Sequence, residues 1–387
     1  MPDNREHLDE LVERFRYWLH IEDPRTLWTI VATKISHKLP GDPVWIMLVG
    51  PSSDGKSEIL RSFVQDGEQT VDDLTVNTFV SGYRSKATDD EPHFAELLKN
   101  RMWYIFDMSI LLSKKNEIRS ELLSQLRMIY DGQLEKRYGN KVHVTADTSN
   151  NTLIVGSTPA IDSTMLEDQI LGTRFITYRL NTKNNMMVMD KIDINLKDMA
   201  AMRGSLKAKV FDYFSNVTIE DIELVEQELR NIKILTEQTR ILRTSVELDK
   251  NKEIRNIAYP EGAGRLYKQL LKLYKAYRVI GLTEFEATDC IRKICIDNIN
   301  PVRMKILRYM VDHNDNFSTT SEIARNTKLG KGSCKGHLFS MTALDIIQYD
   351  EVFDSEQKRM LDQWLLIGGD FNLLLGLKPE PDQLLLY

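Results

Sequence analysis

Eight consecutive residues carry the strongest chemical pattern in the chain, Gly50-Pro51-Ser52-Ser53-Asp54-Gly55-Lys56-Ser57. They fit G-x-x-x-x-G-K-[S/T], a loop in which glycines let backbone amides turn inward around phosphate oxygens. In such a loop Lys56 reaches the β- and γ-phosphates, and the Ser57 hydroxyl binds Mg²⁺. Glu58 follows directly and is a further candidate nucleotide contact. The pattern predicts a site for ATP and Mg²⁺, and the alternative is a chance Gly/Ser turn.

A second acidic position lies further along. Asp107 follows the apolar run 102–106, which indicates a buried strand. We expect this strand to neighbour the phosphate-binding loop, where a carboxylate holds Mg²⁺ through water. The alternative for Asp107 is a helix N-cap. Met108 stands where many ATPases have the glutamate that activates the attacking water, so Glu58 and Glu91 are the remaining candidates for that role.

The elements that must position these residues are indicated by hydrophobic periodicity. Apolar residues recur at helical spacing over 5–20, and a second helix is expected from Pro24 to about Gly41. Buried or strand-like runs follow, alternating with helical segments, and this alternation predicts an α/β fold with a parallel, helix-covered sheet. The expected strands are 44–49, 75–80, 102–106, 152–156 and 175–180, and the expected helices are 57–63, 94–99 and 116–130.

Beyond about residue 185 the strand signal disappears. Residues 193–282 are predicted to be helical, with 220–252 forming a long, largely solvated hairpin. Residues 302–313, 321–327 and 333–344 are predicted helices, and 346–349 and 363–367 are predicted strands around a polar wing. This order is that of a winged helix. The expected division is 1–40, an N-terminal helical segment; 41–185, the ATPase core; 186–296, a helical lid; and 297–387, the winged helix and tail.

The order of these motifs resembles the AAA+ superfamily, and within it the minichromosome-maintenance helicases, above all the self-loading helicases of mobile genetic elements. Thr158 ends a segment that looks like the sensor-1 strand, at a position where the family usually has asparagine. Arg174, in Gly172-Thr173-Arg174-Phe175, is similar to the family's arginine finger. Arg265 opens a helix as the sensor-2 arginine does. The resemblance implies a ring, with hexamers most common, whose subunits share ATP sites; a structural ion pair is the alternative for Arg174.

Two basic segments are candidates for contact with nucleic acid. Gly139-Asn140 between β-rich runs indicates a hairpin, with Lys136, Arg137 and Lys141 near its tip and Tyr138 and His143 available for stacking. The resemblance places a pore-facing hairpin at this point in the motif order. In the predicted winged helix, Lys331, Lys335 and His337 are expected to face outward from the third helix. The alternative for the hairpin is an exposed turn that is charged for solubility. The alternative for the winged helix is contact with a protein.

Composition limits the classes of function. The chain has 387 residues, a net charge of −6 and three cysteines, so nucleic acid would need a local basic surface and no disulfide framework is expected. Apolar runs long enough for a membrane span and a signal peptide are not found, and a cytoplasmic location is expected. These observations favour an ATP-driven DNA helicase or translocase. The alternative is a non-motor ATP switch, such as an initiator, loader or regulator; a small-molecule kinase is disfavoured.

Overall fold

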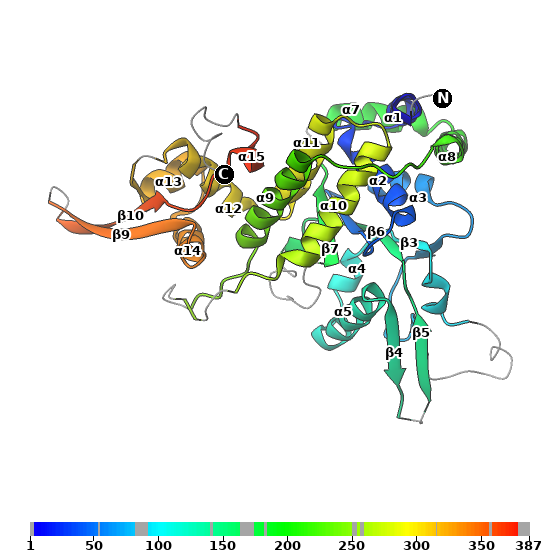
Figure 1. Ribbon diagram of the computed structural model, residues 1–387, viewed down its shortest axis with the longest axis horizontal. Helices are drawn as coiled ribbons and strands as arrows, with labels where there is room; N and C mark the ends of the chain where they lie inside the picture. Colours follow the sequence, from blue (N-terminus) through cyan, green and yellow to red (C-terminus); the bar gives the residue numbers. More distant parts are fainter. Residues whose placement is uncertain are drawn as a thin grey trace. The chain divides into compact units, whose positions relative to one another are not determined.

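The chain divides into two compact units, which are described separately. The computed structural model describes residues 4–52, 55–81, 92–139, 142–162, 174–181, 184–249, 254–255, 259–314, 316–355 and 358–377. The first unit comprises residues 1–225 and 268–290, and the second comprises 226–267 and 291–387, so the boundary falls within two helices (Figure 1).

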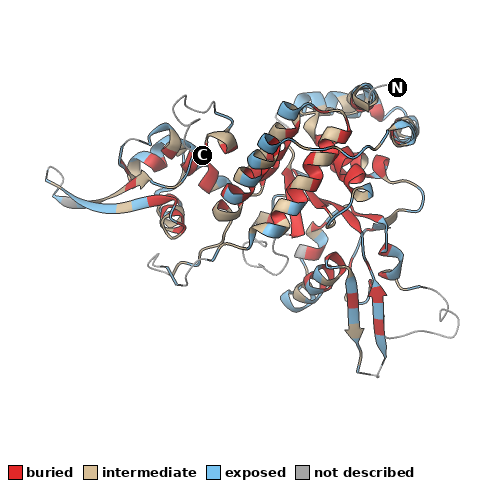
Figure 2. Cartoon of the chain, viewed as in Figure 1, coloured by how far each residue is buried: buried red, intermediate tan, exposed pale blue. Residues whose placement is uncertain are grey.

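A five-stranded parallel sheet forms the centre of the first unit. Its order is β2-β3-β6-β1-β7. The strands are β1 (Trp45–Val49), β2 (Gln69–Val71), β3 (Met102–Ile105), β6 (Thr152–Ser157) and β7 (Phe175–Arg179). All residues of β1, β3 and β6 are buried (Figure 2). Continuous apolar runs of this kind are the mark of strands covered on both faces, and the predicted α/β class is confirmed.

The predicted strand 75–80 is wrong. Thr75 and Thr78 form a turn, closed by a backbone hydrogen bond of 3.0 Å. Phe79 and Val80 are buried in the core from this loop, which explains the apolar signal. The edge position of the sheet is taken instead by β2, which pairs with β3. The apolar pattern of residues 75–80 therefore indicates burial of Phe79 and Val80 rather than a strand paired in the sheet.

Helices cover the sheet as expected from their periodicity. The helices of the first unit are α1 (Asn4–Trp18), α2 (Arg25–Lys38), α3 (Lys56–Phe63), the 3₁₀ turn η1 (Glu96–Leu98), α4 (Ser109–Leu112), α5 (Asn116–Tyr130), α7 (Asn185–Asn195) and α8 (Met199–Asn216). α1 buries Leu8, Leu11, Val12 and Phe15 along one face and packs against α8. The predicted helix 94–99 is reduced to η1 and a turn.

In the first unit, a two-stranded hairpin lies between α5 and β6 in the sequence. It consists of β4 (Gln133–Arg137) and β5 (His143–Asp147), paired antiparallel. Residues alternate between buried and exposed along both strands, with Leu134, Val144 and Ala146 packed into the hydrophobic core. The hairpin predicted from Gly139-Asn140 is therefore present.

The second unit contains a small antiparallel sheet within a helical frame. Its elements are α9 (Glu226–Leu242), the flanking parts of α10 (Ala263–Val279) and α11 (Glu284–Asp297), α12 (Pro301–Asp312), β8 (Ser318–Thr319), α13 (Thr320–Thr327), α14 (Lys331–Thr342), β9 (Ile347–Asp354), β10 (Arg359–Leu366) and α15 (Asn372–Leu375). The sheet order is β8-β10-β9. Thr319 begins α13 with a capping box to Glu322. The predicted winged-helix order is present.

The hairpin predicted over 220–252 is wrong. α9 is a single helix that ends at Leu242, and Leu248 then forms an isolated bridge with Ile254. α9 is also not largely solvated, because Ile232, Leu235 and Leu242 are at most 1% exposed. The high charge of the segment concealed an apolar stripe at helical spacing.

Candidate functional site

The phosphate-binding loop connects β1 to α3, as its motif requires. Gly50 follows β1, and its amide donates to the Ser157 carbonyl over 3.2 Å. Gly55 precedes α3 with φ of 75° and ψ of 0°, a left-handed conformation that a residue with a Cβ rarely adopts. The N-cap residue of α3, Gly55, has no side chain to cap the helix, and a helix N-terminus presents amides and a positive dipole end to an anion. Ser53 and Asp54 lie outside the described residues.

Lys56 is folded back onto the loop that carries it. Its side chain is buried, and Nζ donates to the Gly50 carbonyl at 2.7 Å and to the Pro51 carbonyl. Ser57, next in sequence, is exposed. The ammonium thus donates to two backbone carbonyls of the loop, and phosphate oxygens would be charge-assisted partners at the same place.

Three strand ends are joined by hydrogen bonds beside this loop. The Met108 amide donates to the Gly156 carbonyl at 2.8 Å, just as Gly50 is joined to Ser157. A Cβ on Gly156 would lie 2.4 Å from the Phe106 carbonyl oxygen, so only glycine permits this approach. The junction fixes Asp107, two residues beyond β3, at the same edge of the sheet as the phosphate-binding loop.

β3 does not neighbour β1, contrary to the expectation for Asp107, because β6 lies between them. Two strand spacings separate Asp107 from the loop by about 10 Å. The Asp107 carboxylate is exposed and accepts one hydrogen bond from the Ser109 amide at 2.8 Å, in the manner of a helix cap.

The donor set suits Mg²⁺ better than a metal held by protein alone. Within the described ranges, three or more His, Cys, Asp or Glu side chains nowhere gather into a metal site. Mg²⁺ commonly keeps several waters and takes one or two protein oxygens plus phosphate oxygens. The Ser57 hydroxyl and the Asp107 carboxylate, at the same edge of the sheet, are oxygens of the kind that Mg²⁺ takes from a protein.

Thr158 follows β6, between the loop and Asp107. Its hydroxyl lies 3.0 Å from the Ser109 hydroxyl, and either oxygen can be the donor. Met108 is 0% exposed and packs in the hydrophobic core. The position that the sequence compared with a catalytic glutamate therefore faces the core rather than the site.

An apolar pocket of about 330 Å³ opens beside Lys56 and Ser57. Its walls come from the linker between α1 and α2, from the start of α3, and from α7 and α8. The side chains that the sequence analysis missed are Leu19, His20, Ile21, Ile59, Val188, Lys191, Ile192, Asn195, Leu196, Met199 and Met202. The available signal was the Met- and Ile-rich run 186–202. An apolar cavity beside an anion cradle fits a base attached to a phosphate chain.

Asn195 is one of the polar side chains that line this pocket. It is 4% exposed, and its Nδ2 donates to the Trp18 carbonyl at 2.7 Å. Its Oδ1 has no hydrogen-bond partner among the described residues. Turning the amide over would set two oxygens against each other, so the Trp18 carbonyl fixes its orientation. A buried acceptor without a donor costs free energy until a ligand supplies one.

Glu58 lines the same pocket and is held by Arg203 of α8. The carboxylate accepts from Arg203 Nε at 2.8 Å and Nη2 at 2.6 Å, a bidentate pair. The hydrogen bonds from Arg203 lower the pKa of Glu58 below its ordinary value. A carboxylate stabilised in its charged form is a weak base, so Glu58 is suited to positioning rather than to activating water.

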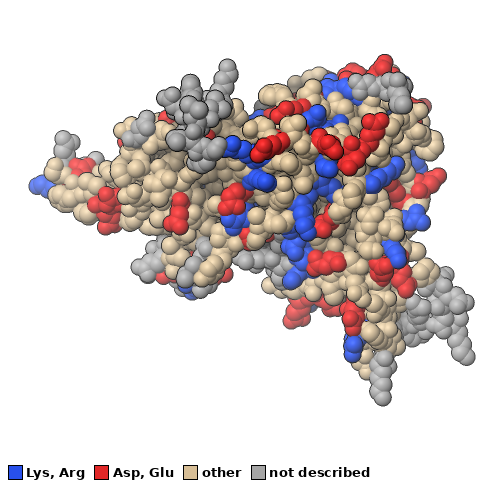
Figure 3. Space-filling view, in the orientation of Figure 1, with Lys and Arg blue, Asp and Glu red and all other residues tan. Residues whose placement is uncertain are grey.

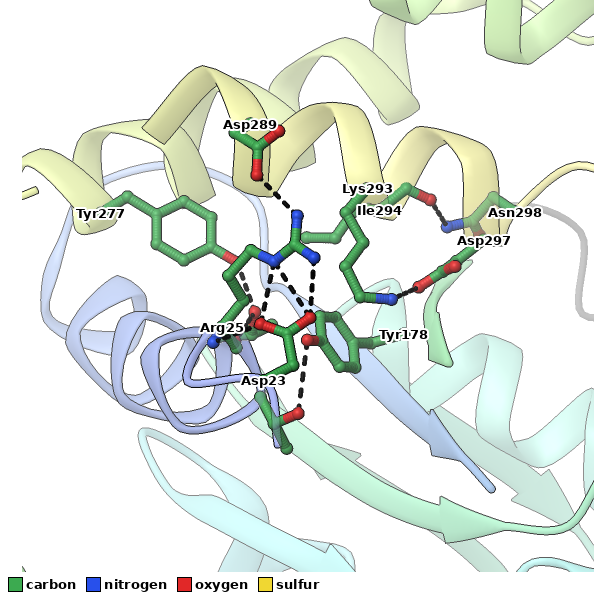
Figure 4. Close-up of polar contacts among 11 residues, drawn as sticks. Asp23, Arg25, Tyr178, Tyr277, Asp289, Lys293, Ile294, Asp297 and Asn298 are labelled. Atoms are coloured by element: carbon green, nitrogen blue, oxygen red, sulfur yellow. Dashed lines mark hydrogen bonds and ion pairs between the residues drawn. The ribbon is translucent and has the colours of Figure 1, made fainter. Parts of the chain in front are cut away.

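The linker that lines the pocket is anchored at its far end (Figure 4). Arg25 pairs with Asp23 at 2.8 Å and with Asp289 of α11 at 2.5 Å. The Tyr277 hydroxyl lies 2.7 Å from Thr29 Oγ1 on the same helix, α2. These contacts fix the start of α2, and therefore the path of residues 19–21 into the pocket.

Arg174 is buried beside the sheet. Its side chain pairs with Asp131 at 2.7 Å and lies over the Tyr130 ring, while Nε has no partner among the described residues. Gln269 of α10 donates to the Arg174 carbonyl at 2.8 Å. This is the ion pair that the sequence left open as the alternative. Residues 163–173 lie outside the described part, and Arg265 lies in the first turn of α10 in the second unit.

The hairpin's basic residues are engaged by acidic neighbours. Lys136 pairs with Glu121 at 2.8 Å, and Arg137 lies 3.3 Å from Glu135. The Tyr138 hydroxyl donates to the Val80 carbonyl at 2.7 Å, which ties the ring to the core loop. Lys141 is outside the described residues. On the face shown in Figure 3, basic and acidic side chains are interspersed.

The three candidate residues on α14, the third helix of the winged helix, do not all face outward as expected. Lys331 is exposed, whereas Lys335 pairs with Asp362 of β10 at 2.6 Å. His337 is half-buried, and burial lowers its pKa, with a further contribution from the Arg303 charge. Neutral His337 therefore supplies no cation to a phosphate, and Lys331 remains the exposed cation of the three.

Comparison with known proteins leaves the family open. No family model matches the chain, and no curated protein matches it. Among the solved structures that resemble it is the apo A form of the NrS-1 C-terminal region, at 12% identity over 95% of this chain and 76% of that chain with a TM-score of 0.31. Another is the Aeropyrum pernix ORC1 protein in complex with DNA, at 9% identity over 97% of this chain and 92% of that chain with a TM-score of 0.22. At these values the likenesses decide neither family nor function. Across the described helices, none is long and apolar enough to cross a membrane.

Proposed function

We propose that the protein binds ATP with Mg²⁺ at the carboxyl edge of its parallel sheet and hydrolyses it to act on DNA. The observation that carries nucleotide binding is the apolar pocket beside Lys56 and Ser57, because it supplies a base site next to the phosphate loop. Ser57 and Asp107 would hold the metal, which supplies charge stabilisation at the phosphates when bound. Lys56 would exchange the loop carbonyls for phosphate oxygens.

The proposed action on DNA is that of a helicase or translocase working as a ring. It is supported by the motif order and by the hairpin, and it assigns a pore-facing role to β4–β5 and a duplex-facing role to Lys331. Arg174 would leave Asp131 to reach a neighbouring subunit's phosphates. Under this proposal, the division at residues 40, 185 and 296 separates collar, ATPase core, lid and winged helix.

ATP turnover by the wild type, with and without single-stranded DNA at low salt, tests the proposal. Low salt is chosen because phosphate contacts are strongest there. Lys56→Ala should lower turnover by about two to three orders of magnitude. Lys207→Ala, at an exposed position on α8, is the control and should leave turnover unchanged. Turnover that is insensitive to DNA at every salt concentration would exclude the motor.

Arg174 requires a test that separates assembly from fold stability. Arg174→Ala and Asp131→Ala both break the same ion pair, but only the first removes the cation. If Arg174 acts on a neighbour's nucleotide, Arg174→Ala abolishes turnover while ATP binding persists, and Asp131→Ala keeps turnover. Equal loss in both variants would mean that the pair is structural only.

A non-motor ATP switch is favoured by a separate observation. Met108 faces the core and Glu58 is held in a bidentate pair, so neither is placed as a general base. ATP binding with negligible turnover, together with nucleotide-dependent assembly or DNA binding, would support this alternative. Multiple turnover stimulated by DNA would exclude it.

A further inference from the structure

The second unit contains an apolar groove that is separate from the nucleotide site. Its volume is about 690 Å³, and it runs between α9 and the segment that follows β10. Ile234 and Ile241 lie two helical turns apart on one wall, so both face the same side. Phe371 and Ile346 form part of the opposite wall, and Leu377, 45% exposed, lies at its edge.

One buried polar group in this groove is unsatisfied. Gln238 is 9% exposed and donates through Nε2 to the Asp370 carbonyl. Its Oε1 has no hydrogen-bond partner among the described residues. The Asp370 carbonyl fixes the amide orientation, since the reverse would oppose two oxygens. Mostly apolar walls, with one buried acceptor that has no partner among the described residues, fit an apolar peptide that brings a backbone N–H.

We propose that the groove binds residues 384–387 of the same molecule, Leu-Leu-Leu-Tyr. Leu377 already lies at the groove, and the chain continues from it through Lys-Pro-Glu-Pro-Asp-Gln to these four apolar residues. A six-residue spacer reaches about 20 Å when extended, and the α9 wall from Gln227 to Ile241 measures about 21 Å. The spacer therefore allows the apolar segment to reach any point along the groove.

Tethering makes even weak binding effective. A short linker gives an effective concentration of about 1 mM, so a segment that binds with a Kd of about 0.1 mM when free occupies its site about ten times as often as it leaves it open. Burial of three leucines and a tyrosine exceeds what such an affinity requires, before the ordering cost is subtracted.

Thiol labelling of the full chain measures whether the groove is occupied. The three native cysteines are buried, so Ile234→Cys in the groove wall becomes the reactive reporter. With the native tail, the reporter should react about tenfold more slowly than in a chain that also carries Leu384→Asp, Leu385→Asp and Leu386→Asp. A synthetic peptide of residues 378–387, added to the substituted chain, should slow the reaction again.

Two controls define the outcome. Lys233→Cys, on the exposed side of α9, should react at the same rate with either tail, which shows that the tail substitutions leave the helix folded. The protection of Ile234→Cys should not depend on protein concentration. Equal reactivity with both tails would overturn the proposal, and protection that grows with concentration would assign the groove to a second copy instead.

Discussion

The Thr158 hydroxyl lies 3.0 Å from the Ser109 hydroxyl, which links the end of β6 to the turn that follows Asp107. This contact sits between the phosphate-binding loop and the proposed metal carboxylate, because β6 separates β1 from β3. At this position the Thr158 hydroxyl can form a hydrogen bond to a bound phosphate while the Ser109 hydroxyl keeps it in place.

Thr158→Val keeps the shape of the side chain and removes the hydroxyl. If Thr158 senses the γ-phosphate, turnover should fall by about one order of magnitude or more while ATP affinity changes little, since one hydrogen bond in the transition state is lost. Ser109→Ala is the matched control, because it removes the partner and leaves the Thr158 hydroxyl. Loss of the same size in both variants would show that the contact only supports the turn.

Asn195 is expected to select the base. Its Oδ1, unpaired among the described residues, can accept from the N6 amino group of adenine, whereas guanine has an acceptor, O6, at that position. Competition binding should favour ATP over GTP by about tenfold in the wild type, and Asn195→Ala should reduce that preference toward unity. Met199→Leu, an apolar change in the same pocket, should keep it. An unchanged preference in Asn195→Ala would remove this residue from base recognition.

We expect that the fold does not tolerate glutamate at position 108, where other ATPases have it. Because the side chain is 0% exposed, Met108→Glu buries a carboxylate without a cation and should lower the free energy of unfolding by about 3 kcal/mol or more. Met108→Leu conserves volume and should cost less than about 1.5 kcal/mol. Chemical denaturation measures both. A gain of turnover in a stable Met108→Glu protein would show that the side chain reaches the site.

The Glu58–Arg203 ion pair should make the stability of the protein depend on pH, in a direction that follows from the Glu58 pKa. The folded pKa of Glu58 is lowered, so the pair stabilises the protein above the ordinary carboxyl range and the stabilisation is lost as pH falls through the lowered value. Arg203→Ala should raise the Glu58 pKa toward its ordinary value, which NMR titration of the carboxyl carbon detects. Lys207→Ala should leave the Glu58 pKa unchanged. A pKa that stays low without Arg203 would mean that other groups hold the charged form.

The sequence by itself determined the local elements and the anion loop. Strands 44–49 and 152–156 are continuous apolar runs, and such runs leave few alternatives to a strand buried on both faces. The fixed residues between Gly50 and Ser57 encode their conformation directly, because glycines and a helix start suffice for it. The winged-helix order was also readable, since capping and periodicity are short-range properties.

Only the tertiary structure decided which of these residues meet. Strand order is a non-local pairing, so no local pattern revealed that β6 separates Asp107 from the loop. The pocket joins residues 19–21 with 188–202, and Asn195 became notable only once burial left its Oδ1 unpaired. By position in sequence, Met108 stands in place of a catalytic glutamate and Arg174 in place of an arginine finger, but packing buries the first in the core and pairs the second with Asp131. A side chain's neighbours across the fold, rather than its spacing along the chain, set its charge partners and its exposure.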